Sequence, residues 1–480
     1  MKEVNGKKAM TNMLWRLAER FGAQGVTVIV EIVLARVLDP EIYGTVALVT
    51  VFTTILQVFV DSGLGTALVQ KKDADQLDFS SVFFANIVAC VILYISMFFA
   101  APWISAFYGI PELTSITRVT SLIVVISGVK NVQQAYVSRN LLFKKFFFAT
   151  LGGTIGAAII GIWMAYHGFG VWALVTQLLF NQAVDTIILW VTVKWRPSFQ
   201  FSFDRLKSLF SYGWKLLASQ LLETVYNDLR SLIIGKLYTE ADLAYYNRGK
   251  MFPQFLTNNT NSAINSVLLP VMSQAQDDTE KVKMMTRRAI KTSSYIIWPM
   301  MIGLAACAEP IVRIVLTEKW LPCVLFLRIF CISFAFYPIH TANLNAIKAL
   351  GRSDIFLKLE IWKKIVGMII LVSTMWFGVE IMAYSLLLSS LAGQIINTWP
   401  NKKLLKYGYI EQLKDIAPSV LMSLAMGAIV FPIQLIRLSD VLTLLIQIVL
   451  GVGVYLLLSK LFKVDSLAYL LGMIKSYRRR

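Results

Sequence analysis

The sequence predicts an all-α polytopic membrane protein with about fourteen transmembrane helices. Of its 480 residues, 57% are hydrophobic and 15% are charged, whereas soluble domains carry about 25% charged residues. Its mean hydropathy is +0.64. Apolar stretches of about 20 residues, long enough to cross about 30 Å of hydrocarbon, follow one another with short connections. This composition excludes a disordered chain, a coiled coil and a disulfide-stapled scaffold.

The apolar stretches predict the individual spans. Fourteen helical segments are expected, at 14–37, 42–60, 80–106, 115–138, 147–166, 171–193, 213–237, 243–272, 289–316, 322–347, 359–376, 381–399, 416–436 and 441–459. Charged residues interrupt segments one, seven and eight, so hydropathy alone would miss these three. Between residues 199 and 212 aromatic and basic residues alternate, which is typical of an interfacial helix or of a plain linker between two halves.

Lysine and arginine fall on alternate loops, which predicts the orientation. The N-terminal region, every second loop and the C-terminal tail together hold 29 of them, whereas the other loops hold only Lys319 and Arg437. Basic loops stay in the cytoplasm. We therefore expect both termini to be cytoplasmic and the number of spans to be even.

The loops and the reactive residues exclude several classes of protein. The loops on the acidic face are too short for a catalytic domain, and no GxxxxGK[ST] motif is present to bind ATP. The four cysteines all lie in apolar stretches without a CxxC pair, and there are only two histidines. We expect neither a metal site nor a cofactor, and we do not expect an enzyme.

An internal repeat predicts two similar halves. Residues 34–48 align without gaps on residues 234–248, and each stretch has a base followed by a short acidic turn. A fainter match pairs 168–173 with 377–383. Two six-helix lobes in the same orientation, with two trailing helices, follow from this offset. The expected division is an N-terminal lobe at 1–195, a cytoplasmic interfacial linker at 196–212, a C-terminal lobe at 213–400, and the trailing helices with a basic tail at 401–480.

Polar side chains form stripes along four of the predicted spans. Steps of three or four residues place each set on one helix face. The sets are Arg16, Arg20, Gln24, Thr27 and Glu31 in segment one; Thr50, Thr54, Gln57 and Asp61 in segment two; Lys215, Ser219, Glu223, Asn227 and Arg230 in segment seven; and Asn247, Gln254, Asn258, Asn261 and Asn265 in segment eight. They predict a hydrated central cavity faced by these segments, against the alternative of polar contacts that hold helices together.

Basic residues outnumber acidic ones within the spans, so we expect a cationic cavity and an anionic cargo. Arginine and lysine suit phosphate oxygens. The candidates to bind the cargo are Arg118, Lys130, Lys215, Arg230, Arg248 and Arg328, together with Asn258 and Asn261. The candidates to titrate with a coupling proton or sodium ion are Glu31, Asp61, Glu223 and Asp228, and the alternative is that each is a static partner of a nearby base.

Five stretches carry a family resemblance through their order and spacing. They are LARVLDPEIYGTVAL from Leu34, DSGLGTALVQKKD from Asp61, VSRNLLFKK from Val137, GFGVWALV from Gly168 and YYNRGKMFPQF from Tyr245. They resemble the polysaccharide-export flippases (Wzx type) of the multidrug/oligosaccharidyl-lipid/polysaccharide (MOP) exporter superfamily, over essentially the whole chain.

The resemblance implies a V-shaped transporter in the bacterial cytoplasmic membrane. It would flip polyprenyl-diphosphate-linked oligosaccharide to the outer leaflet by ion-coupled alternating access, for O-antigen, capsule or exopolysaccharide assembly, with a glycan polymerase and a chain-length protein as partners. No nucleic acid is expected. Three alternatives stay open: a peptidoglycan lipid-precursor flippase, a multidrug cation antiporter of the same superfamily, and a non-transporting scaffold of a glycan assembly complex.

Overall fold

In a computed structural model, the chain is helical and without strands over the part described, which comprises residues 6–61, 63–436 and 438–478. The side chains of residues 6–14, 16–18, 20, 21, 212, 263 and 473–478 lie outside this description. The helices form two compact units, residues 1–244 and 245–480.

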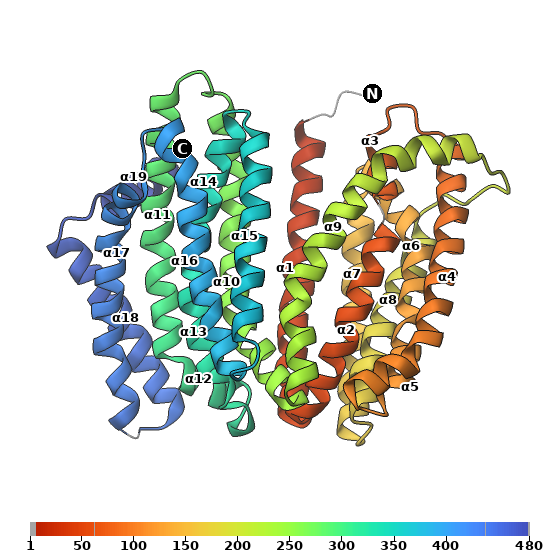
Figure 1. The fold of residues 1–480 in the computed structure, drawn as a ribbon, viewed down its shortest axis with the longest axis horizontal. Coiled ribbons are helices and arrows are strands. Elements are labelled where there is room, and N and C mark those ends of the chain that lie inside the picture. Colours follow the sequence, from red (N-terminus) through yellow and green to blue (C-terminus); the bar gives the residue numbers. More distant parts are fainter. Residues whose placement is uncertain (1–5, 62, 437, 479–480) are drawn as a thin grey trace. The chain divides into compact units, whose positions relative to one another are not determined.

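The first unit is a bundle of long helices with two short ones. Its helices are α1 (Gly6–Val37), α2 (Pro40–Asp61), α3 (Leu64–Gln70), α4 (Gln76–Tyr108), α5 (Leu113–Thr120), α6 (Leu122–Arg139), α7 (Phe143–Tyr166), α8 (Val171–Thr192) and α9 (Phe203–Leu237). The short helices α3 and α5 lie at opposite ends of this unit (Figure 1). Helix α10 (Glu240–Ser273) begins in the first unit and continues in the second.

The second unit contains most of α10 and the remaining helices. These are α11 (Thr279–Ala306), α12 (Ala308–Val315), the 3-10 turn η1 (Glu318–Trp320), α13 (Cys323–Ala335), α14 (Tyr337–Ala349), α15 (Ser353–Thr374), α16 (Val379–Leu404), α17 (Tyr409–Val430), the 3-10 turn η2 (Phe431–Ile436), α18 (Asp440–Leu461) and α19 (Asp465–Arg478).

Each predicted segment falls on one helix or on two consecutive helices, and the prediction of a polytopic membrane protein is confirmed. Among the residues described, nine helices are long and apolar enough to cross a membrane, or ten if α11 and α12, which meet at a bend of 66°, form one span. Segments one, seven and eight (α1, α9 and α10) fall short of this criterion, as the charges within them predicted, and so does α15. The count of fourteen spans therefore stays a prediction.

The seventh segment begins earlier than predicted. Helix α9 starts at Phe203 rather than at residue 213, so the connection between α8 and α9 shortens to 193–202. This connection is extended and is held by α4, because the Ser198 backbone amide donates to the Ser80 hydroxyl at 3.0 Å. Helix α9 packs against α2, α3 and α4 within the first unit. The expected lobes at 1–195 and 213–400 stay a prediction.

The backbone repeats the turn that the sequence alignment suggested. Helix α1 ends at Val37 and α2 begins at Pro40, while α9 ends at Leu237 and α10 begins at Glu240, an offset of 200 residues. Both turns belong to the first unit, and there they touch. A Cβ atom at Gly44 would stand 1.9 Å from the Glu240 carbonyl oxygen, so only glycine allows this approach.

Three basic loops of the first unit meet, as expected if they share one membrane face. The Arg139 guanidinium donates to the carbonyl oxygens of Leu68 and Lys72, at 2.7 Å each, and also to that of Lys71. These bonds satisfy carbonyl groups at the C-terminal end of α3. The Arg205 side chain lies 3.4 Å from the Asp78 carboxylate at the start of α4.

Glycines bring the helices of the first unit close together. A Cβ at Gly153 of α7 would stand 2.8 Å from the Asn181 carbonyl oxygen of α8. A Cβ at Gly128 of α6 would stand 2.6 Å from the Cys90 Sγ of α4. Small residues allow such close backbone approach between membrane helices. They position α6 and α8, the two helices that carry the buried charges described next.

Candidate functional site

The first unit encloses an ion pair between two of its membrane helices. The Lys130 ammonium group, on α6, lies 2.8 Å from the Asp185 carboxylate and donates to the Gln182 side-chain oxygen at 2.9 Å; both partners are on α8. Lys130 is 8% exposed and Asp185 is 9% exposed. A charge inside the hydrocarbon is costly, so a buried pair at this depth marks a candidate functional site.

Hydrogen bonds extend this ion pair to a third helix. The side-chain amide of Gln182 donates to the Ser127 hydroxyl, and the Gln57 side-chain amide of α2 donates to the same hydroxyl at 2.7 Å. Spacings of three residues between Ser127 and Lys130, and between Gln182 and Asp185, place each pair on one helix face. We name these five residues, Gln57, Ser127, Lys130, Gln182 and Asp185, the charged network.

A second carboxylate lies next to the charged network. Asp61, the last residue of α2, accepts a hydrogen bond of 3.0 Å from the side-chain amide of Asn131, the neighbour of Lys130. Asp61 is exposed, whereas Asp185 is buried. Within the described part of the chain, the second Asp185 oxygen is buried and has no hydrogen-bond partner. The site therefore contains one accessible carboxylate, Asp61, and one buried oxygen of Asp185 that has no hydrogen-bond partner among the described residues.

The structure brings only two of the predicted site residues, Lys130 and Asp61, to this network. Gln57 belongs to the polar stripe predicted in segment two, whereas Ser127, Gln182 and Asp185 were not among the predicted site residues. The signal that could have found Gln182 and Asp185 is their spacing of three residues in segment six.

Three of the four predicted arginines, Arg118, Arg248 and Arg328, each lie against an aromatic ring of their own unit. The guanidinium of Arg118 stacks over the Phe98 ring at 4.1 Å, and its Nε donates to the Phe98 carbonyl oxygen at 3.1 Å. In the second unit, the guanidinium groups of Arg248 and Arg328 lie 5.1 Å from the rings of Trp320 and Phe431. Such cation–π contacts help to hold these arginines in place.

The remaining candidates are spread over three helices. On α9, Lys215 and Glu223 are exposed, whereas Asp228 and Arg230 are half-buried; Glu31 is half-buried on α1. On α10, Asn258 is exposed and Asn261 is half-buried. The Arg16 and Arg20 side chains of the first stripe lie outside the described residues. The cavity predicted between segments one, two, seven and eight would be lined by residues of both units, and it stays a prediction.

The second unit holds a buried polar cluster of a different kind, which sequence reasoning missed. Asn343 of α14 and Gln412 of α17 exchange two side-chain hydrogen bonds of 2.9 and 2.8 Å. Asn401 of α16 donates to the Asn343 side-chain oxygen at 2.7 Å, and the Thr398 hydroxyl donates to Gln412 at 3.2 Å. We name these four residues the amide network. Asn343, Asn401 and Gln412 are each 0% exposed.

Comparison with known proteins identifies the family. A model of the family described as "Polysaccharide biosynthesis protein" matches residues 33–325. The chain belongs to this family. It is also 26% identical over 318 residues to the succinoglycan biosynthesis transport protein ExoT of Rhizobium meliloti, an alignment that covers 66% of this chain and 64% of that protein. The resemblance drawn from the sequence is thereby confirmed.

Solved structures show which fold this member of the polysaccharide biosynthesis protein family adopts. The lipid II flippase MurJ in an inward closed conformation matches with a TM-score of 0.76 and 17% identity, over 94% of this chain and 99% of that one. An inward-facing multidrug resistance MATE transporter of the MOP superfamily matches with a TM-score of 0.61 and 17% identity, over 80% of this chain and 96% of that one. The chain therefore has the fold of MOP-superfamily transporters.

Proposed function

We propose that this protein flips polyprenyl-diphosphate-linked oligosaccharide from the cytoplasmic to the outer leaflet of a bacterial cytoplasmic membrane. The observation that carries the proposal is its membership of the polysaccharide biosynthesis protein family, together with the likeness to a transport protein of succinoglycan biosynthesis. The excess of basic residues on alternate loops supports cytoplasmic termini. The glycan serves O-antigen, capsule or exopolysaccharide assembly, with a glycan polymerase and a chain-length protein as partners.

Basic residues within the helices support an anionic cargo. A diphosphate group is bound best by arginine and lysine. Arg118, Arg248 and Arg328 are held by stacking on rings, which fixes each guanidinium before the cargo arrives. Lys215 and Arg230 on α9, and Asn258 and Asn261 on α10, complete the proposed set.

The charged network supports ion coupling. Asp61 is accessible and stands next to Asn131 and Lys130, so a proton or a sodium ion that reaches it changes the charge beside the ion pair. We propose that this change alters the Lys130–Asp185 pairing and so links ion entry to a rearrangement of α2, α6 and α8. Glu31, Glu223 and Asp228 are the other proposed coupling carboxylates.

The test is reconstitution of the full chain into liposomes with a fluorescent polyprenyl-diphosphate oligosaccharide. Protection of the label from a membrane-impermeant quencher is followed with no gradient, with a proton gradient and with a sodium gradient. We expect protein-dependent protection that one of the two gradients accelerates. Absence of protection by correctly folded protein would refute the proposal.

A lipid-linked peptidoglycan precursor is the second candidate cargo, favoured by the fold shared with a lipid II flippase. It carries the same diphosphate, so only competition separates the two. An excess of unlabelled polyprenyl-diphosphate oligosaccharide should slow protection of the fluorescent label from the quencher. An excess of the peptidoglycan precursor should slow it far less. The reverse order would assign the protein to peptidoglycan synthesis, and inhibition by neither lipid would favour a drug antiporter or a scaffold.

A further inference from the structure

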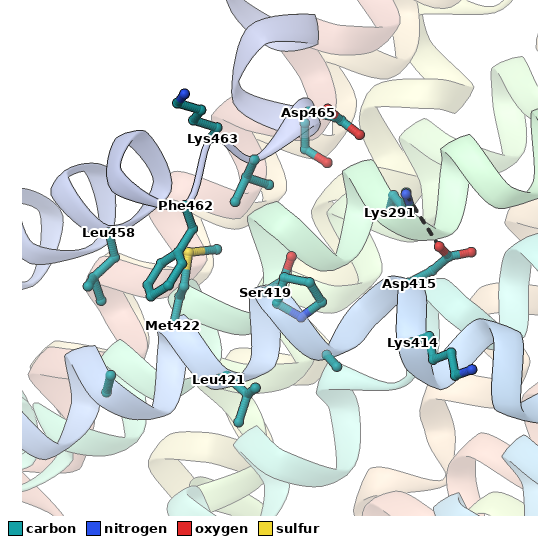
Figure 2. Close-up of a pocket in the computed structure, with 15 residues that line it drawn as sticks. Lys291, Lys414, Asp415, Ser419, Leu421, Met422, Leu458, Phe462, Lys463 and Asp465 are labelled. Carbon is teal, nitrogen blue, oxygen red and sulfur yellow. Dashed lines mark ion pairs between the residues drawn. The ribbon is translucent and has the colours of Figure 1, made fainter.

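A cavity of about 830 Å³ lies in the second unit where α11, α17, α18 and the start of α19 meet. Figure 2 shows its two chemically different sides. One is apolar and is formed by Leu421, Met422, Leu458 and Phe462, with Ala425 further along α17. The other is charged: Lys291, Lys414 and Asp415 lie at one end of it, and Lys463 and Asp465 lie apart from them where α18 connects to α19. The cavity is therefore amphipathic.

The charge balance on the polar side favours an anion. Asp415 is neutralised by Arg287 and Lys291, at 2.7 and 3.3 Å. Lys414 and Lys463 are exposed, and within the described residues no acidic group lies at ion-pair distance from either. Asp465 is the one remaining carboxylate on this side. The bases thus outnumber the acids around the opening.

The position of the cavity points to a lipid. Lys414 and Lys463 belong to the regions expected on the cytoplasmic face; in the structure Lys414 lies near the start of the apolar helix α17, and Lys463 follows the end of the apolar helix α18. An acyl chain requires an apolar wall, and a phosphate head group requires cations at the membrane surface, which is the combination present here. Basic pockets on the cytoplasmic side of membrane proteins bind anionic head groups.

We propose that this cavity binds one anionic phospholipid of the cytoplasmic leaflet. The head-group phosphate lies at the opening beside Lys463, to which Lys414 adds positive charge from α17, and the upper part of one acyl chain lies against Leu421, Met422 and Phe462. The lipid then bridges α17 to the connection between α18 and α19 within the second unit, whereas the charged network belongs to the first unit. The inference stands whether or not the chain flips oligosaccharide.

The test is native mass spectrometry of the full-length protein, titrated in detergent with phosphatidylglycerol or with phosphatidylcholine. We expect one tightly bound phosphatidylglycerol and much weaker binding of phosphatidylcholine. Each lysine removed should weaken the first phosphatidylglycerol by roughly fivefold, as expected for one basic residue near a lipid surface. Lys414→Ala/Lys463→Ala should therefore lose most of the binding, whereas the matched pair Lys281→Ala/Lys358→Ala, on exposed lysines outside the cavity, should retain it.

A second variant tests the apolar side independently of charge. Ala425 is exposed and lines the cavity, so Ala425→Trp should fill it and abolish the tight site without removing any cation. Equal binding of both lipids, or unchanged phosphatidylglycerol binding in both variants, would overturn the proposal. Displacement of phosphatidylglycerol by an equimolar polyprenyl diphosphate would overturn it too, because the cavity would then belong to the path of the cargo.

Discussion

The charged network of the first unit contains an ion pair, whereas the amide network of the second unit consists of neutral side chains. Lys130 and Asp185 form an ion pair with one carboxylate oxygen left without a partner among the described residues. In the second unit, Asn343 and Gln412 satisfy each other through two reciprocal hydrogen bonds. A charge can be changed by a proton or an ion, but a paired amide cannot.

The difference indicates different roles for the two networks. Neutral side-chain hydrogen bonds between membrane helices typically contribute about 0.6 kcal/mol each and at most about 2 kcal/mol, as expected of groups that hold helices together. Ionisable residues in spans are rare and usually functional. This contrast supports the proposal that the charged network serves ion coupling and that the amide network holds helices together.

The largest effect is expected from breaking the ion pair. Lys130→Met leaves the Asp185 carboxylate buried without its cation, which should lower the free energy of unfolding by about 3–5 kcal/mol. The double variant Lys130→Met/Asp185→Leu should recover most of this loss, because no unpaired charge remains. Thermal unfolding in detergent measures both, with Lys215→Met, an exposed lysine on α9, as the control. A single variant as stable as the control would show that the pair is not formed.

We expect substitutions in the amide network to lower the free energy of unfolding less than loss of the ion pair does. Asn343→Leu removes the acceptor of the Gln412 side-chain amide, although Gln412 still accepts from Thr398, and this loss should cost about 1–3 kcal/mol. Asn343→Leu/Gln412→Leu should be closer to wild type than the single variant is. If Asn343→Leu were as costly as Lys130→Met in the same unfolding experiment, the contrast between the two networks would be lost.

The contact between the two repeated turns should depend on a single glycine. Gly44→Ala forces Glu240 away, because the new Cβ would stand 1.9 Å from its carbonyl oxygen. Overpacking of this kind typically costs about 1–3 kcal/mol. Gly25→Ala is the matched control, since a Cβ at Gly25 meets nothing within 4 Å. Equal melting temperatures for the two variants would mean that the turns do not touch.

The smallest expected change in stability concerns the N-terminal cap of α4, which lies outside the spans. The backbone amide of Asp78 donates to the Asp75 carboxylate at 2.9 Å, and this bond lowers the pKa of Asp75. The stabilisation is present above the ordinary aspartate pKa and is lost as the pH falls through the lowered one. Asp75→Ala should cost about 1 kcal/mol at neutral pH. Asp75→Asn, which retains the cap, should lose only the pH dependence, measured by thermal unfolding between pH 3 and pH 7.

The sequence predicted the helices well because each span must bury a continuous apolar face. It also pointed to Lys130 and Asp61, because a charged residue within or at the end of a span stands out against an apolar background. It did not reveal that Asp185 is the partner of Lys130, because the pairing depends on helix packing, in which Gly128 brings α6 close to α4 and Gly153 brings α7 close to α8. The sequence did not indicate the amide network, because asparagine and glutamine carry no charge and stand out less against an apolar background.

The start of α9 shows a second limit. Aromatic and basic residues between 199 and 212 are compatible with a linker or with a helix, and local pattern does not separate the two. The distinction depends on a tertiary contact, the hydrogen bond from the Ser198 amide to Ser80 on α4. The stacking of Arg118 on Phe98 likewise depends on a tertiary contact, and the role of Arg118 in cargo binding stays a prediction.

The most direct test of the assignment compares the two double variants in the liposome flipping assay. Wild-type protein, Lys130→Met/Asp185→Leu and Asn343→Leu/Gln412→Leu are reconstituted at equal density after thermal unfolding has shown that each is folded. We predict gradient-accelerated flipping of the polyprenyl-diphosphate oligosaccharide by wild type and by the amide variant, and loss of the gradient response in the charged-network variant. An unchanged gradient response in the charged-network variant would contradict the assignment.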